Sequence, residues 1–159
     1  MNAELTARLA QLVRARSTAA LATLHVDAPS VSMVPYAVAA DGSGFIIHVS
    51  ALAAHTKDLL ADARVSLLIA EAEGGGKSPL ALARVSVQAT AQQVASGSPG
   101  LPEFRAAYVA RFPDAEPMFG FADFSMFLIR PLSVRFVAGF GQAHSLSGES
   151  LVQILRQRR

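Results

Sequence analysis

Residues 44–60 read GFIIHVSALAAHTKDLL, and this stretch decides the fold that the sequence predicts. Its first part is an apolar run typical of a strand, with Phe45, Ile47 and Val49 on one face. Ile46, His48 and Ser50 then occupy the opposite face. A turn at Ser50 leads into a helix near residues 53–61. Residues 48–57 are called the strand–helix corner below.

The start of that helix carries polar groups that suit an anion. Unpaired backbone N–H groups at a helix N-terminus attract anions, of which phosphate is the commonest in biology. Ser50 and Thr56 would add hydroxyl groups to this corner, and Lys57 would add a positive charge. We therefore interpret the corner as a phosphate site. The alternative is an ordinary strand–turn–helix connection with a polar helix start.

Length and composition bound the class of protein. A chain of 159 residues, 52% apolar and 16% charged, is expected to fold as a single domain over residues 1–159. The absence of cysteine excludes disulfides, thiol catalysis and thiolate zinc sites. The basic residues form a cluster only in the tail Arg156–Arg159, so no nucleic acid partner is expected. The sequence shows neither a signal peptide nor a long apolar run, so we expect a cytoplasmic protein with no membrane contact.

Periodicity and turn residues predict the remaining elements. Helices are expected near 2–15, 53–61, 102–112 and 147–156. Strands are expected at 19–26, 30–38, 45–50, 64–70, 82–94, 122–129 and 132–138. Asp27-Ala28-Pro29 is expected to form the first turn, and Arg130-Pro131 is expected to separate the last two strands. Gly74-Gly75-Gly76 is expected to lie in a connecting loop, because no P-loop pattern follows it.

These six or seven short strands are joined mostly by hairpin turns. Consecutive antiparallel strands favour a barrel or a sandwich whose ends are closed by helices. The strand at 82–94 alternates most regularly, with Arg84 on its polar face and Val85 on its apolar face. Pro35 suits an edge strand or a place where the strand leaves the sheet, because proline cannot donate to the ladder. The expected fold is therefore mainly β with peripheral helices.

Few residues are placed for catalysis or for metal binding. The four histidines, His25, His48, His55 and His144, lack the spacing of a zinc motif. The sequence contains neither a Gly-x-Ser-x-Gly elbow nor a Gly-x-Gly-x-x-Gly turn. His48 and His55 could share one polar pocket, or they could be a structural pair. The Phe- and Met-rich run Met118–Phe127 is typical of core packing or of a subunit interface. No catalytic residue and no metal site is predicted.

Several short motifs occur in an order that is similar to one known family. They are Ser50-x-Leu52-x-x-His55-Thr56, Pro79-Leu80-Ala81-x-x-Arg84-Val85-Ser86, Asp123-Phe124 and Gly139-Phe140-Gly141-Gln142-Ala143. Through this order and spacing, from about Ser17 to Leu146, the chain resembles the pyridoxamine 5'-phosphate oxidase-like FMN-binding split barrels. Within that group it is more similar to the haem-utilisation branch.

The resemblance implies a split β-barrel homodimer that binds FMN non-covalently at the subunit interface. It places the FMN phosphate between the second strand and the strand–helix corner, and it places Arg84 at the flavin ring. The implied FMN contacts are Ser32, Met33, Val34, Pro35, Tyr36, His48, Val49, Ser50, His55, Thr56, Lys57 and Arg84.

The sequence also departs from the family pattern. Ser32 and Ala37 stand where the oxidases carry Arg and Lys, and the chain has no Trp, so oxidation of vitamin B6 is not expected. The longer haem-handling relatives carry a further C-terminal domain with a haem ligand, so we do not expect haem degradation from a sequence that ends at Arg159.

Three hypotheses of function follow from the resemblance. The first is a flavin-dependent oxidoreductase, in which Arg84 stabilises the reduced flavin. The second is a non-enzymatic protein that binds flavin, or haem or another tetrapyrrole, with His144 or His55 as ligand. The third is a dimeric scaffold that has lost its ligand. The sequence indicates neither a substrate nor an electron donor.

Overall fold

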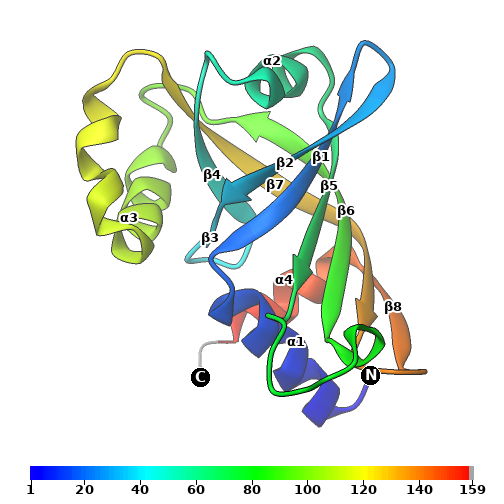
Figure 1. Cartoon of the computed structure of the whole chain (residues 1–159). Helices are drawn as coiled ribbons and strands as arrows, with labels where there is room; N and C mark the ends of the chain where they lie inside the picture. The colour runs from blue at the N-terminus through cyan, green and yellow to red at the C-terminus, as the bar shows by residue number, and fades with distance from the viewer. Residues whose placement is uncertain (158–159) are drawn as a thin grey trace.

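The computed structural model describes residues 1–157, which form one antiparallel sheet curled into a half-barrel with helices around it (Figure 1). The sheet has eight strands, in the order β2-β1-β5-β6-β7-β4-β3, with β8 paired to β7 outside this path. The expected mainly β split barrel is confirmed. In chain order the elements are α1 (Ala3–Ala15), β1 (Thr18–His25), β2 (Ala28–Pro35), β3 (Ala37–Val38), β4 (Phe45–Ser50), α2 (Ala54–Ala61), β5 (Arg64–Ala70), η1 (Pro79–Ala81), β6 (Arg84–Gln93), α3 (Leu101–Arg111), η2 (Pro113–Gly120), β7 (Phe124–Val137), β8 (Ala143–Ser147) and α4 (Gly148–Arg156).

The first hairpin turns earlier than the sequence predicted. Its two turn residues are Val26 and Asp27, with φ of +48° and +64°, and Ala28 already pairs with His25. Two consecutive residues with positive φ match the right-handed twist of the flanking strands, which is why such tight turns are common in hairpins. The predicted turn Asp27-Ala28-Pro29 is therefore wrong, and β2 includes Ala28 and Pro29. β2 forms one end of the strand order, which confirms the edge position predicted from Pro35.

The last part of the sheet also differs from the prediction. The two strands expected on either side of Arg130-Pro131 are one strand, β7, of 14 residues. Opposite Pro131, the register with β6 shifts between Gln88 and Ala89, and such a bulge tolerates a proline that cannot donate. β8 was not predicted. It follows a turn at Gly139–Gly141 and runs back along β7.

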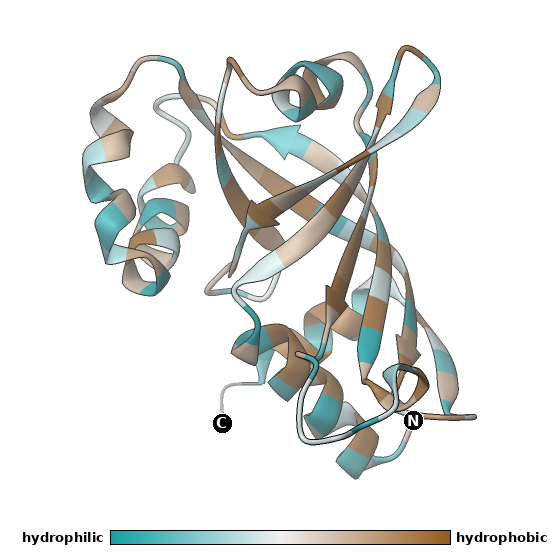
Figure 2. Cartoon of the chain, viewed as in Figure 1, coloured by the Kyte–Doolittle hydropathy of each residue, from teal (hydrophilic) through white to brown (hydrophobic). Residues whose placement is uncertain are grey.

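A main hydrophobic core fills the half-barrel. It contains the predicted face of β4, formed by Phe45, Ile47 and Val49. β6 alternates as predicted, with Val85 and Val87 buried and the residues between them facing outward, and the bands of colour along β6 follow this alternation (Figure 2). α1 and α4 lie together at one end of the half-barrel, and α2 lies at the other end (Figure 1).

A second hydrophobic core lies on the opposite face of β4. It joins Ile46 of β4 to Tyr108 of α3 and to Met126 and Leu128 of β7. The Phe- and Met-rich run therefore contributes to both cores, since Phe127 belongs to the main core. This confirms the core packing expected of that run. Within residues 1–157, we find no helix with both the length and the apolar character that crossing a bilayer requires.

Candidate functional site

The strand–helix corner is built by the residues that end β4 and begin α2. Thr56 Oγ1 donates to the Ser50 carbonyl oxygen over 2.7 Å, and only 1% of Thr56 is exposed. Ser50 Oγ donates to Asp123 Oδ2 over 2.9 Å, next to the start of β7. The Ala51 N–H donates to the Asp123 carbonyl oxygen over 2.6 Å. Both hydroxyl groups predicted to contact phosphate are therefore used to hold the corner in shape.

Among residues 1–157, two backbone N–H groups in the first turn of α2 are free, whereas that of Thr56 donates to the Ala53 carbonyl oxygen over 3.1 Å. Ala53 occupies the N-cap position, and no side chain caps the helix. Among the described residues, the Ala54 and His55 N–H groups have no backbone acceptor outside the helix. Lys57 is exposed in the same turn. Free N–H groups and a cation at a helix N-terminus together favour a bound anion.

His55 connects this corner to the second strand. Its Nδ1 lies 3.3 Å from Ser32 Oγ on β2. Burial lowers the pKa of His55, and the nearby Asp58 carboxylate opposes that effect. The imidazole is therefore biased towards its neutral form. The structure thus brings two of the predicted site residues, Ser32 and His55, into direct contact.

A buried carboxylate under the corner was not foreseen. Asp58 is 4% exposed and lies one turn after His55 in α2. Its Oδ2 accepts from Thr23 Oγ1 over 2.9 Å, and its Oδ1 lies 2.7 Å from His25 Nδ1, both on β1. The bond with His25, and then that with Thr23, hold the pKa of Asp58 below its usual range. A carboxylate between apolar helix positions was the only signal of this cluster in the sequence.

His48 does not share a pocket with His55. Its ring stacks on Phe119 and lies against Phe124 and Tyr108. Burial, and then the charge of Arg105, lower the pKa of His48. Within the described part of the chain no hydrogen bond or ring contact joins His48 to His55, so the geometry favours the structural role for His48.

The other predicted contacts lie in different places. Val34, Tyr36 and Val49 are buried in the main core, so only their backbone atoms could face a ligand. Met33 and Pro35 point out of the edge strand and are exposed.

Arg84 lies far from the corner within one chain. It pairs with Val137 at the end of β7, whereas Ser50 of the corner pairs with Phe124 at the start of β7. That strand spans about 40 Å at ~3.3 Å per residue. A single chain therefore brings together Ser32, Ser50, His55, Thr56 and Lys57, but not Arg84.

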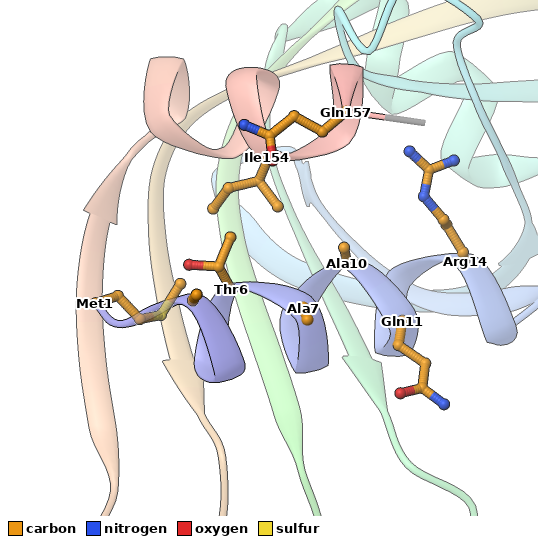
Figure 3. A pocket seen from close by; sticks show the side chains of 9 residues that line it. Met1, Thr6, Ala7, Ala10, Gln11, Arg14, Ile154 and Gln157 are labelled. Atoms are coloured by element: carbon orange, nitrogen blue, oxygen red, sulfur yellow. The ribbon is translucent and has the colours of Figure 1, made fainter. Parts of the chain in front are cut away.

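A hollow lies between α1 and α4, at the opposite end of the molecule from α2 (Figure 3). Its volume is about 440 Å³, and Thr6 and Ala10 of α1 point towards Ile154 of α4 (Figure 3). Arg14 at its rim already donates to the Leu155 carbonyl oxygen over 2.6 Å. The lining holds no further charged side chain, so it is a weaker candidate than the corner. In the residues that the structure describes, no three His, Asp or Glu side chains are grouped as metal ligands would be.

The half-barrel of antiparallel strands with peripheral helices places the chain among the split β-barrel proteins. The chain belongs to the pyridoxamine 5'-phosphate oxidase family, whose model matches residues 5–138.

Two relatives in this family carry haem-related names. The chain is 40% identical over 121 residues to the chloroplastic non-canonical heme oxygenase HOZ of Arabidopsis thaliana. This match covers 76% of this chain and 35% of the relative. It is 30% identical over 142 residues to the heme oxygenase HutZ of Vibrio cholerae, covering 88% of this chain and 80% of the relative. The chain thus spans about a third of the plant protein but most of the bacterial one.

A solved structure agrees with this assignment. The heme binding protein from Mycobacterium smegmatis superimposes with a TM-score of 0.85 at 28% identity. The match covers 96% of this chain and 62% of that one. The resemblance to the haem-utilisation branch is confirmed by these relatives.

Proposed function

We propose that this protein binds haem, and that the strand–helix corner holds one of the anionic propionate groups. The observation that carries the proposal is the similarity to two heme oxygenases and a heme binding protein. This favours the second of the three hypotheses over a flavin-dependent oxidoreductase. When bound, haem supplies redox and oxygen chemistry that the side chains themselves lack.

The corner fits a carboxylate chemically. The free N–H groups of Ala54 and His55 point away from α2 at its positive end, and Lys57 adds a full charge. A charge-assisted hydrogen bond to such donors is stronger than a neutral one. The same donors fit a phosphate, so FMN remains the second candidate. Its support is the family membership and this corner.

Two histidines are candidates for the haem iron. Iron binds the neutral imidazole, and the lowered pKa of His55 favours that form. Nδ1 of His55 lies beside Ser32 Oγ, which leaves Nε2 free to bind. His144 lies on β8 opposite Phe136, at the end of the sheet that also holds Arg84.

We also propose that the protein is a homodimer through the outer face of β2, β1 and β5. Met33, Ala20 and Leu68 form one row across these strands, and Val31 lies in the next row. Val31 is 70% exposed, Met33 66% and Leu68 43%. Beside these rows, Leu24, Pro29 and Leu132 line a hollow of about 430 Å³. An apolar surface of this kind on a sheet is typical of a subunit interface.

A dimer would also account for Arg84. Arg84 and Ser86 lie on the outward face of β6, and Ser86 pairs with Leu68 of β5. If two copies pack with this face in common and their strands run in opposite directions, Arg84 of one copy approaches the corner of the other. The ligand site would then be complete only in the dimer.

The test is an absorption titration of the apoprotein with haemin and, separately, with FMN. We expect a Soret band with haemin that saturates at one haem per chain. The His55→Ala and His144→Ala variants identify the ligand, because loss of the histidine that binds iron shifts the Soret band. Lys57→Ala should weaken haemin binding without shifting the Soret band.

Each outcome has a clear meaning. Saturable FMN binding without a Soret band would replace haem by flavin as the cofactor. If neither haemin nor FMN binds, the proposed function is wrong. If haemin binds equally well to the wild type and to the combined Lys57→Ala and Arg84→Ala variant, the corner is not the propionate site.

A further inference from the structure

We infer that Asp123 makes the strand–helix corner select a carboxylate over a phosphate. This inference rests on the proposed function and names the class of anion that the same site accepts. Asp123 binds the hydroxyl group of Ser50 and places a negative charge beside the corner. A ligand that needs this hydroxyl group, or that carries two negative charges, therefore binds less well. Asp123 is thus a specificity-determining residue that acts through Ser50.

The hydrogen-bond donors that precede α2 have acceptors within the protein. The Ala51 N–H donates to the Asp123 carbonyl oxygen over 2.6 Å, and the Ala53 N–H donates to the Ser50 carbonyl oxygen over 3.1 Å. The Leu52 N–H donates to Ser50 Oγ over 3.2 Å. These bonds fix the backbone between β4 and α2, and they withdraw three N–H groups from any ligand at the corner.

The fixed donors that remain match a carboxylate in number. Among the described residues, these donors are the N–H groups of Ala54 and His55 in the first turn of α2. A carboxylate has two oxygens, whereas a phosphate monoester has three that accept strong hydrogen bonds. Lys57 is exposed and attracts either anion, so it does not discriminate between them. A phosphate at the corner would lack a fixed donor for its third oxygen unless Ser50 supplied its hydroxyl group.

The Ser50 hydroxyl group is withheld from a ligand because Asp123 already accepts its proton. Ser50 Oγ donates to Asp123 Oδ2 over 2.9 Å. A hydrogen bond to a carboxylate is stronger than one to a neutral acceptor, so this bond competes well with a bound ligand. A phosphate would have to displace the Asp123 carboxylate before it could accept from Ser50. Asp123 therefore acts as an internal anion that competes with phosphate for this donor.

The negative charge of Asp123 adds to this effect. Ser50 bonds to both Asp123 and Thr56, so two hydrogen bonds connect the carboxylate to the first turn of α2. Repulsion between charges is proportional to the charge of the ligand, so a dianionic phosphate is repelled twice as strongly as a carboxylate. Because Asp123 is exposed, water and salt screen this repulsion. We expect the charge to weaken carboxylate binding about twofold and phosphate binding about fourfold.

The experiment measures the dissociation constants of FMN and of haemin at pH 8, where the phosphate of FMN carries about two charges. Asp123→Asn removes the charge and keeps an oxygen that accepts from Ser50. Asp123→Ala removes the charge and also frees the Ser50 hydroxyl group. Both variants keep the bond from the Ala51 N–H, because that bond uses the backbone carbonyl oxygen of residue 123.

The two variants should differ in their affinity for FMN. We expect Asp123→Asn to tighten FMN binding about fourfold and haemin binding about twofold. Asp123→Ala should tighten FMN binding about tenfold, because the phosphate gains a charge-assisted hydrogen bond from Ser50. Adding Ser50→Ala to Asp123→Ala should remove that further gain. Asp114→Asn is the matched control, since Asp114 is an exposed carboxylate of η2, and it should leave both dissociation constants unchanged.

The outcomes separate this inference from the proposed function. If haemin binds but FMN binds no better to the Asp123 variants than to the wild type, the inference is wrong and the proposed function stands. If Asp114→Asn tightens FMN binding as much, only net charge matters, and the inference is again wrong. If FMN binding tightens as expected but no protein gives a Soret band with haemin, the exclusion of phosphate by Asp123 stands and the proposed function is overturned. Circular dichroism confirms that the compared proteins are folded.

Discussion

His48 and Phe119 stack face to face, with ring centroids 4.0 Å apart and ring planes 6° from parallel. The guanidinium carbon of Arg105 lies 4.9 Å from the centroid of the Phe119 ring. Tyr108 lies edge-on to both stacked rings. Phe119 thereby joins η2 and α3 to β4. The β4 residue in this contact, His48, lies two residues before Ser50.

Replacing Phe119 by Ala should loosen α3 and η2. Loss of the stack on His48 and of the contact with Arg105 is expected to lower the free energy of unfolding by about 2 kcal/mol. Urea denaturation followed by circular dichroism measures this change. Phe121→Ala is the matched control, because Phe121 is 54% exposed and should cost less than half as much. Equal losses in the two variants would show that the stack contributes nothing specific.

The histidines predict how stability depends on pH. The pKa of His48 is lowered from 6.5, first by burial and then by Arg105, and that of His55 is lowered by burial. The unfolded chain therefore binds more protons than the fold just below pH 6.5, so stability falls as the pH decreases through this range. Urea denaturation at pH 7.5, 6.5 and 5.5 should show this loss. The loss should be smaller in His48→Gln, and an unchanged slope would contradict the assignment.

The hydroxyl of Tyr36, which lies between β2 and β3, connects this part of the chain to α1. Tyr36 is 0% exposed, and its hydroxyl donates to the Val13 carbonyl oxygen over 2.6 Å. Burial raises the pKa of Tyr36 well above its usual value, so the hydroxyl keeps its proton at any ordinary pH. Tyr36→Phe should lower the free energy of unfolding by about 1–2 kcal/mol, because Val13 loses its partner. Urea denaturation with an unchanged midpoint would show that water replaces the hydroxyl.

Gly44 lies where a side chain would meet the next strand. A Cβ at this position would collide with the Ile129 carbonyl oxygen of β7. Gly44→Ala should therefore shift β4 and lower the free energy of unfolding by about 2–3 kcal/mol. Gly120→Ala is the control, since a Cβ there meets nothing within 4 Å. The thermal midpoints of both variants test the difference, and similar midpoints would contradict the close approach.

Much of the fold could be predicted because alternation along a strand is a local property. The buried faces of β4 and β6 follow directly from their apolar spacing. The continuity of β7 through Pro131 could not be predicted, because it depends on a bulge in the pairing with β6. The turn at Val26 was equally hidden, since a β-branched residue rarely adopts positive φ.

The sequence predicted that the strand–helix corner and the second strand lie together, but it did not predict the hydrogen bonds within the corner. The strand–helix corner and Ser32 were expected together, and the structure places His55 beside Ser32. Ser50 donates to Asp123, which is 73 residues away in the sequence. Thr56 donates to the Ser50 carbonyl oxygen, a local bond that its polar position alone did not predict. The contact of Asp58 with His25 and Thr23 also joins distant parts of the chain. Such pairings arise from the closure of the sheet, which no local pattern describes.

The homodimer that we propose would form through the outer face of β2, β1 and β5. A Lys at Leu68 would place a charge among Ala20, Met33 and the same residues of a second copy, and burial of an unpaired charge is costly. We expect Leu68→Lys to raise the dissociation constant of the dimer at least tenfold. Leu60→Lys is the matched control, because Leu60 is 59% exposed on α2, away from this face. Sedimentation equilibrium measures the dimer dissociation constants of the wild type and of both variants. A wild type that is monomeric at high concentration, or a dimer that both variants leave intact, would exclude this face as the interface.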